Sequence, residues 1–196
     1  FDRGRLRSDA LRRYGLEQSR GVVGIVGGSL GAGLLNDTAE DVAKIAAEHG
    51  FGLLHLTGAA HFENVQKRSQ SAANWRAFGF EGEMEFFYAA CDLVLARAGG
   101  AVAELTATNT PSILVPGGFG SGRHQAANAE ALSRRGAAVV VPEAEIARLP
   151  LLVGSLLSHR DRLEELAGAA KTLARPDAAS VIASALIEYA VGSAHG

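Results

Sequence analysis

The chain has 196 residues, enough for one domain with a sizeable core. Hydrophobic residues make up 47% and charged residues 20%, which is typical of a globular chain and not of a disordered one. Lysine and arginine number 19 and aspartate and glutamate 21, so the net charge is −2 and there is no basic excess for binding duplex nucleic acid. We therefore expect no nucleic-acid partner.

Cysteine content and hydropathy exclude further classes of protein. The single cysteine, Cys91, excludes a disulfide framework and a cysteine-cluster metal site. No apolar run approaches the roughly 18 residues that a membrane-spanning helix needs. Because the chain opens with Phe1 and not with Met, we expect it to be a piece of a longer protein.

The first 13 residues carry five arginines, interleaved with Asp2 and Asp9. A helix with this pattern could touch an anionic membrane surface. The simpler interpretation is a solvated helix face, and we favour it. The arginines are Arg3, Arg5, Arg7, Arg12 and Arg13.

Six short apolar runs follow, and each is predicted to be a strand. They are near-continuous in Val, Leu and Ile, as in strands that are covered on both faces of a parallel sheet. Helical patterns separate them, and the tail reads as helix from 146 to 189, broken at Pro150 and at Arg175 and Pro176. The predicted strands are 21–28, 51–58, 75–80, 92–98, 111–117 and 137–142, and the predicted helices between them are 34–49, 84–91, 102–108 and 125–135.

This alternation predicts an α/β fold, a Rossmann-like doubly wound sheet of six parallel strands with helices on both faces. In such a sheet, ligands bind at the carboxyl ends of the strands. The turns that follow the strands are therefore the candidate site.

The first of these turns contains Gly28, Ser29 and Gly31. Glycines let the backbone approach a ligand, and the helix that follows offers free N–H groups to an anion. The turn resembles the dinucleotide fingerprint GxGxxG without matching it. The next strand ends in the sequence HLTG, which lacks the acid that would hold a ribose, so a nicotinamide oxidoreductase is disfavoured. A plain tight turn is the alternative.

The second turn runs from Arg97 to Ala101 and opens a helix that contains Glu104. The amides of Gly99, Gly100 and Ala101 could cradle a diphosphate. A carboxylate one helical turn further on can accept two hydrogen bonds from a ribose diol. The alternative for Glu104 is a first-turn acid that is favoured by the helix dipole.

The third turn, residues 116–125, is rich in glycine and ends in His124 and Gln125, with Asn128 on the same helix. Such side chains read hydroxyl-rich ligands such as sugars, although a surface loop with a capped helix has the same composition. The chain has no acidic pair at a strand end and no cluster with metal-ligand spacing, so we expect no metal site and no cofactor. No residue is assigned a catalytic role.

Taken in order, these segments resemble the MurG family of N-acetylglucosaminyltransferases. The resemblance runs from about Gly21 to the end of the chain. It rests on GGSLGAGLLN, HLTG, GFEGEMEFFYAACDLVLARAGGAVAEL, PSILVP, HQAANAEAL, GAAVVV and PDAA. That family transfers GlcNAc from UDP-N-acetylglucosamine to lipid I, which forms lipid II in peptidoglycan synthesis.

The resemblance implies the C-terminal half of a GT-B enzyme, in which two Rossmann-like halves face each other across a cleft. Residues 1–196 are then one UDP-GlcNAc-binding domain. The lipid I acceptor, the general base and the peripheral contact with the cytoplasmic face of the bacterial plasma membrane belong to an N-terminal domain that this chain lacks. The helices after Pro176 would cross to that domain or lie exposed.

The resemblance also assigns the residues that bind the donor. Phe80 and Glu81 lie where the family holds the uracil, largely by its backbone, and Met84 opens the next helix. Glu104 matches the residue that binds the ribose hydroxyls. The full set is Gly28, Ser29, Gly31, Phe80, Glu81, Met84, Gly99, Gly100, Ala101, Glu104, His124, Gln125 and Asn128.

Two departures from the family pattern stand out. Glu81 occupies a position that is commonly apolar, and the segment 99–101 lacks the hydroxyl side chains that the family usually has there. Losing hydroxyl donors to phosphate predicts weaker donor binding, by about ten- to a hundredfold. The alternatives are another UDP-sugar enzyme of the same architecture, such as a glycolipid glycosyltransferase or a UDP-GlcNAc 2-epimerase, and a non-catalytic UDP-sugar-binding module.

Overall fold

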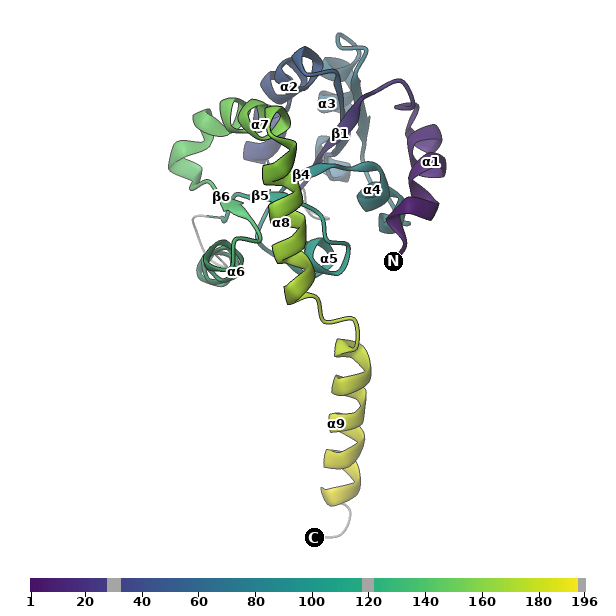
Figure 1. Ribbon diagram of the computed structural model, residues 1–196, viewed down its shortest axis with the longest axis vertical. Coiled ribbons are helices and arrows are strands. Elements are labelled where there is room, and N and C mark those ends of the chain that lie inside the picture. Colours follow the sequence, from purple (N-terminus) through teal and green to yellow (C-terminus); the bar gives the residue numbers. More distant parts are fainter. Residues whose placement is uncertain (28–32, 118–121, 194–196) are drawn as a thin grey trace.

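A computed structural model describes residues 1–27, 33–117 and 122–193. Its centre is a six-stranded sheet in the order β3-β2-β1-β4-β5-β6, with every neighbouring pair parallel (Figure 1). This confirms the predicted doubly wound sheet. The strands are β1 (Gly21–Val26), β2 (Phe51–Leu56), β3 (Trp75–Phe78), β4 (Leu93–Ala96), β5 (Ser112–Leu114) and β6 (Val139–Val140).

Helices cover both faces of the sheet. One face packs against α2, α3 and α7, and the other against α1, α4, α5 and α6, while α8 contributes to both cores. The helices are α1 (Arg3–Tyr14), α2 (Gly33–Glu48), α3 (Phe62–Ser69), α4 (Met84–Ala90), α5 (Ala101–Ala107), α6 (Gly122–Arg134), α7 (Leu149–Ser158), α8 (Arg160–Leu173) and α9 (Ala178–Ser193), with 3-10 turns η1 (Ala59–His61) and η2 (Glu143–Arg148).

Strand β1 explains why the apolar runs are continuous. Val23 and Ile25 belong to one core and Val22 and Val26 to the other, so each position of the strand is buried. Gly24 faces α4, where an added Cβ would lie only 2.6 Å from the Cys91 sulfur. A glycine is required there because α4 packs directly on the strand backbone.

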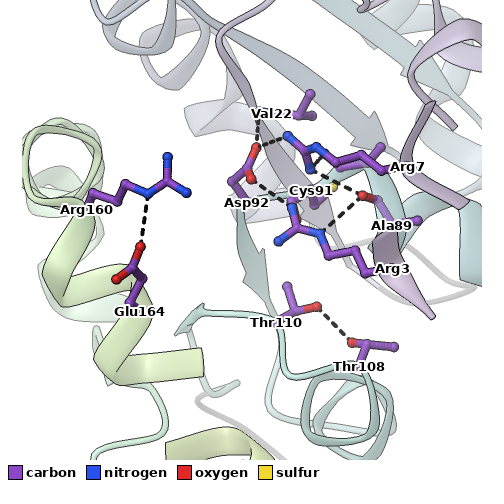
Figure 2. Close-up of polar contacts among 11 residues, drawn as sticks. Arg3, Arg7, Val22, Ala89, Cys91, Asp92, Thr108, Thr110, Arg160 and Glu164 are labelled. Atoms are coloured by element: carbon purple, nitrogen blue, oxygen red, sulfur yellow. Dashed lines mark hydrogen bonds and ion pairs between the residues drawn. The ribbon is translucent and has the colours of Figure 1, made fainter. Parts of the chain in front are cut away.

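Helix α1 is held to this unit by ion pairs, which corrects the prediction of a solvated face. Arg3 and Arg7 both reach the Asp92 carboxylate, at 2.7 and 2.8 Å (Figure 2). They also donate to backbone carbonyls at the end of α4, among them that of Cys91. Asp92 in turn accepts the Val22 amide at 2.8 Å. The arginines therefore join α1 to the β1–β4 pair.

The tail is helical, but its first break is not where the sequence predicts it. Pro150 lies in the first turn of α7, where proline is tolerated because the amide there has no partner within the helix. The break falls instead at His159, which separates α7 from α8 and has an extended ψ of 87°. The predicted break at Arg175 and Pro176 is confirmed, because α8 ends at Leu173 and α9 begins at Ala178.

Helix α9 extends away from the rest of the molecule (Figure 1). Its large apolar side chains are exposed, from 57% at Val181 to 78% at Tyr189. Among the described residues, no helix has the length and apolar character needed to cross a membrane.

His55 lies within β2 and is completely buried. Its Nε2 lies 2.8 Å from the Asn36 Oδ1, and its ring stacks on Trp75. The amide nitrogen of Asn36 donates to the Thr57 carbonyl, so Nε2 of His55 is the donor and Nδ1 carries no proton. Nδ1 has no hydrogen-bond partner among the described residues. Burial, together with the charge of Arg68, lowers the pKa of His55 from 6.5 to about 3.

We expect this histidine to make folding sensitive to pH. Between pH 6.5 and about 3 the unfolded chain binds a proton at His55 that the folded chain does not, so acid favours unfolding. From pH 7 to pH 5 the free energy of unfolding should fall by about 2 kcal/mol from this group alone. Urea unfolding at both pH values tests this. A His55→Gln variant should be less stable at pH 7, but its free energy of unfolding should fall less between pH 7 and pH 5. An equal fall in the variant and the unaltered chain would show that His55 is not the cause of the pH dependence.

Candidate functional site

The sheet changes winding direction between β1 and β4. Their ladder ends at the pair Val26 and Ala96. Beyond it, the chain from β1 continues to α2 on one face of the sheet, and the chain from β4 continues to α5 on the other. Connections that part in this way leave a crevice at the carboxyl ends of the strands.

A cleft of about 480 Å³ occupies this position, within the range of ~300–1,000 Å³ that is typical of small-molecule sites. It brings together the end of β1, the end of β2, the segment after β3 and the first turn of α5. Its lining consists of Val26, Leu56, Gly58, Gly79, Phe80, Glu81, Gly82, Met84, Gly100, Ala101 and Glu104.

Glu104 stands on α5 with its side chain exposed to the cleft. The hydroxyl of Tyr88, on α4, donates to its Oε2 at 2.7 Å. Tyr88 is only 1% exposed, and burial together with this hydrogen bond raises its pKa, so the hydroxyl stays protonated and remains a donor. The carboxylate of Glu104 is thus oriented from one side, and its second oxygen can accept from a ligand.

The turn from Arg97 to Ala101 presents backbone to the cleft. A Cβ added at Gly99 or Gly100 would meet no atom within 4 Å, so both glycines border open space. The amides of Val102 and Ala103 donate to the carbonyls of Gly99 and Gly100 and so begin the helical bonding of α5. The amides that precede them belong to the helix start, whose first N–H groups have no partner within the helix. Arg97 is not part of the cleft lining. Its guanidinium pairs with Glu143 at 2.5 Å and donates to the Val115 carbonyl.

The segment after β3 forms the opposite wall. Phe80 is 75% exposed, and Met84 closes the wall where α4 begins. Glu81 contributes to the lining, but its carboxylate accepts a hydrogen bond from the Tyr14 hydroxyl at 2.7 Å and is largely buried. Its side chain therefore points toward α1.

The predicted sugar-reading residues do not line this cleft. Asn128 donates to the Ala98 carbonyl at 2.9 Å, and the Oε1 of Gln125 accepts the Gly117 amide at 2.8 Å. Both therefore anchor α6 to the ends of β4 and β5. His124 is exposed on the first turn of α6.

Three of the predicted residues, Gly28, Ser29 and Gly31, lie outside the described residues. Within the described ranges, no group of three or more His, Cys, Asp or Glu side chains is placed to hold a metal ion.

Six contributors to the site were not predicted from the sequence, namely the lining residues Val26, Leu56, Gly58, Gly79 and Gly82, and Tyr88. Gly58, at the end of HLTG, enters the lining, and Tyr88 orients Glu104 from 16 residues away. The signal for Gly58 was present, because it follows a predicted strand. Tyr88 has no local signal, since a tyrosine inside an apolar helix usually belongs to the core.

Comparison with known proteins places the chain among glycosyltransferases. The Glycosyltransferase family 28 C-terminal domain matches residues 22–182. A UDP-N-acetylglucosamine--N-acetylmuramyl-(pentapeptide) pyrophosphoryl-undecaprenol N-acetylglucosamine transferase from Nitratidesulfovibrio vulgaris is 39% identical over 169 residues, which are 84% of this chain and 46% of that protein. The protein of the same name from Listeria welshimeri is 34% identical, over 91% of this chain and 51% of that protein.

A solved structure agrees with these sequences. The crystal structure of MurG from Acinetobacter baumannii superposes with a TM-score of 0.74 at 28% identity, over 93% of this chain and 53% of that chain. The chain thus spans about half the length of the curated relatives it matches.

Two glycine variants should separate a structural glycine from a site glycine. Gly24→Ala should lower the free energy of unfolding by about 1–3 kcal/mol, because the new Cβ collides with α4. Gly100→Ala should leave it unchanged or raise it by up to about 1 kcal/mol, because Gly100 already has helical φ and ψ angles and open space around it. Urea denaturation measures both, and equal losses would show that the turn at Gly100 is packed.

Proposed function

The chain belongs to the Glycosyltransferase family 28 C-terminal domains, and from that premise we propose that it is the donor-binding domain of an inverting glycosyltransferase. The transferase moves GlcNAc from UDP-GlcNAc to lipid I and forms lipid II in peptidoglycan synthesis. The family is the one that the sequence predicted through its resemblance to MurG. The naming of the curated relatives supports the choice of donor and acceptor.

The observation that carries the proposal is the set of residues that line the cleft beyond the ends of β1 and β4. Three chemically different walls meet there: the segment 79–82, the carboxylate of Glu104, and the turn that contains Gly100 and Ala101. These walls correspond to the three parts of a uridine diphosphate, namely a base, a ribose and two phosphates.

Each wall is suited to one part of the donor. The backbone around Phe80 and Glu81 reads the edge of the uracil. Glu104, oriented by Tyr88, accepts hydrogen bonds from the ribose diol. The amides of the turn 99–101 bind the diphosphate, and the start of α5 adds the positive end of its dipole.

The same walls would serve the chemical step. A hydroxyl of the acceptor attacks the anomeric carbon of GlcNAc, the bond to the β-phosphate oxygen breaks, and UDP leaves. Negative charge grows on the leaving diphosphate in the transition state. Backbone amides that are already aimed at it stabilise that charge without reorganising. The proton of the attacking hydroxyl passes to a base in the N-terminal domain of the whole enzyme.

The whole enzyme supplies what this domain lacks. Its N-terminal domain binds the lipid-linked acceptor and makes the peripheral contact with the cytoplasmic face of the bacterial plasma membrane. Helix α9, with its exposed apolar side chains, is suited to cross to that domain. Residues 1–196 then act as a single UDP-GlcNAc-binding unit.

Nucleotide binding tests the proposal directly. Titration calorimetry with UDP and with UDP-GlcNAc should show weak binding, and this chain alone should transfer no sugar. A folded sample that releases no heat with millimolar UDP would reject the donor site.

The ribose contact has its own test. Glu104→Ala should weaken UDP binding by about ten- to a hundredfold, because it removes an ionised acceptor. Binding of 2′-deoxy-UDP, which lacks one of the two hydroxyls, should be weaker in the unaltered chain and change less on mutation. Glu165→Ala, a change at an exposed acid on α8, is the matched control and should bind UDP normally. Equal losses for the two nucleotides would contradict a ribose role.

A further inference from the structure

The segment 79–82, the wall of the cleft that we assign to the uracil, is fastened to α1 through one carboxylate. The Glu81 side chain is only 8% exposed. Its Oε1 accepts from the Arg13 guanidinium and from the Glu83 amide, both at 2.9 Å, and its Oε2 accepts from the Tyr14 hydroxyl at 2.7 Å. The segment has no helix or strand of its own, so these bonds hold its shape.

The α1 side of this contact is itself fixed. The second guanidinium nitrogen of Arg13 pairs with Glu83 at 2.7 Å, and the group lies over the Phe86 ring at 4.8 Å. Tyr14 is 3% exposed and meets the Phe78 ring edge-on at 5.5 Å. Helix α1 is also held by the ion pairs of Arg3 and Arg7 with Asp92, so it is fastened at both of its ends.

The carboxylate is held in its ionised form. Burial favours the neutral acid, but the backbone amide of Glu83, the Tyr14 hydroxyl and the charge of Arg13 outweigh it and keep the pKa of Glu81 below its ordinary value. Both oxygens of the carboxylate are occupied by these donors, so we infer that Glu81 contributes to the cleft lining through its backbone.

We propose that Glu81 is a positioning residue, through which Arg13 and Tyr14 of α1 fix the backbone that selects the base of the nucleotide. The inference rests on the proposed function, since it concerns the same cleft. It adds an element that lies outside residues 22–182, the extent of the family match.

The contact of Glu81 with Arg13 and Tyr14, called the clamp below, controls the selectivity for one nucleotide base over another. Uracil and cytosine have the same shape, but they present opposite donor and acceptor patterns at positions 3 and 4 of the ring. A fixed backbone N–H and carbonyl reject the wrong pattern, because a buried polar group is left unpaired. A backbone that can shift accommodates either base. The diphosphate is held by a different wall and does not depend on the clamp.

The experiment compares Glu81→Gln and Tyr14→Phe with the unaltered chain, with UDP, CDP and inorganic pyrophosphate as the probes. Glu81→Gln removes the ion pair with Arg13, and Tyr14→Phe removes a single hydrogen bond. Arg12→Gln is the matched control, because Arg12 lies on α1 but pairs with Asp9 and not with the segment. Thermal melts establish that each variant is folded.

We expect Glu81→Gln to weaken UDP binding about tenfold and to bring the UDP and CDP affinities close together, with pyrophosphate binding unchanged. Tyr14→Phe should have a smaller effect in the same direction. The double variant should lose less affinity than the sum of the two single losses, because both changes act on the contacts of the same Glu81 side chain.

Hydrogen exchange gives a readout that needs no ligand. The Glu83 amide, which donates to Glu81, should exchange faster in Glu81→Gln than in the Arg12→Gln control.

The binding results separate the two proposals. If the unaltered chain binds UDP, and Glu81→Gln keeps the same UDP affinity and the same preference for UDP over CDP, the positioning role of Glu81 is wrong and the donor site stands. If the variant loses UDP, CDP and pyrophosphate equally, the role is structural only. If the unaltered chain binds no nucleotide, both proposals fail.

Discussion

The structure depends on how two neighbouring strands separate. β1 and β4 pair as far as Val26 and Ala96, and then their chains leave for opposite faces of the sheet. The hydrophobic cores on the two faces require this, because α2 and α5 must each cover a different side. The crevice that results is open to solvent at the one edge where backbone amides and a helix start lie side by side.

Polar groups around the crevice divide into those that face it and those that hold its walls. Glu104 and the turn at Gly100 face the open space. Arg97, Gln125 and Asn128 were predicted in or near the ligand-binding turns, but they are tied to the backbone or to a neighbouring acid. Tethers of this kind fix the ends of the strands around the cleft, as the proposed binding of a diphosphate by preorganised amides requires.

The walls are held by partners that are far apart in the chain. Asp92 joins α1 to the β1–β4 pair, Glu81 joins α1 to the segment 79–82, and Tyr88 orients Glu104. None of these partnerships could be predicted from the sequence. Arginines on a helix with interleaved acids look like a solvated face, and only the packing of α1 on α4 shows that Arg3, Arg7 and Arg13 are bound.

The sheet, the positions of its turns and the family could be predicted from the amino-acid sequence. Apolar periodicity and turn residues are local signals, and in a doubly wound sheet the topology then places the ends of the strands at one edge. The folded chain was needed to show which of those turns share a cleft, which acids face it, and that His55 is buried and neutral. Those properties arise where segments distant in sequence pack together, and a local pattern does not specify the partner of a side chain.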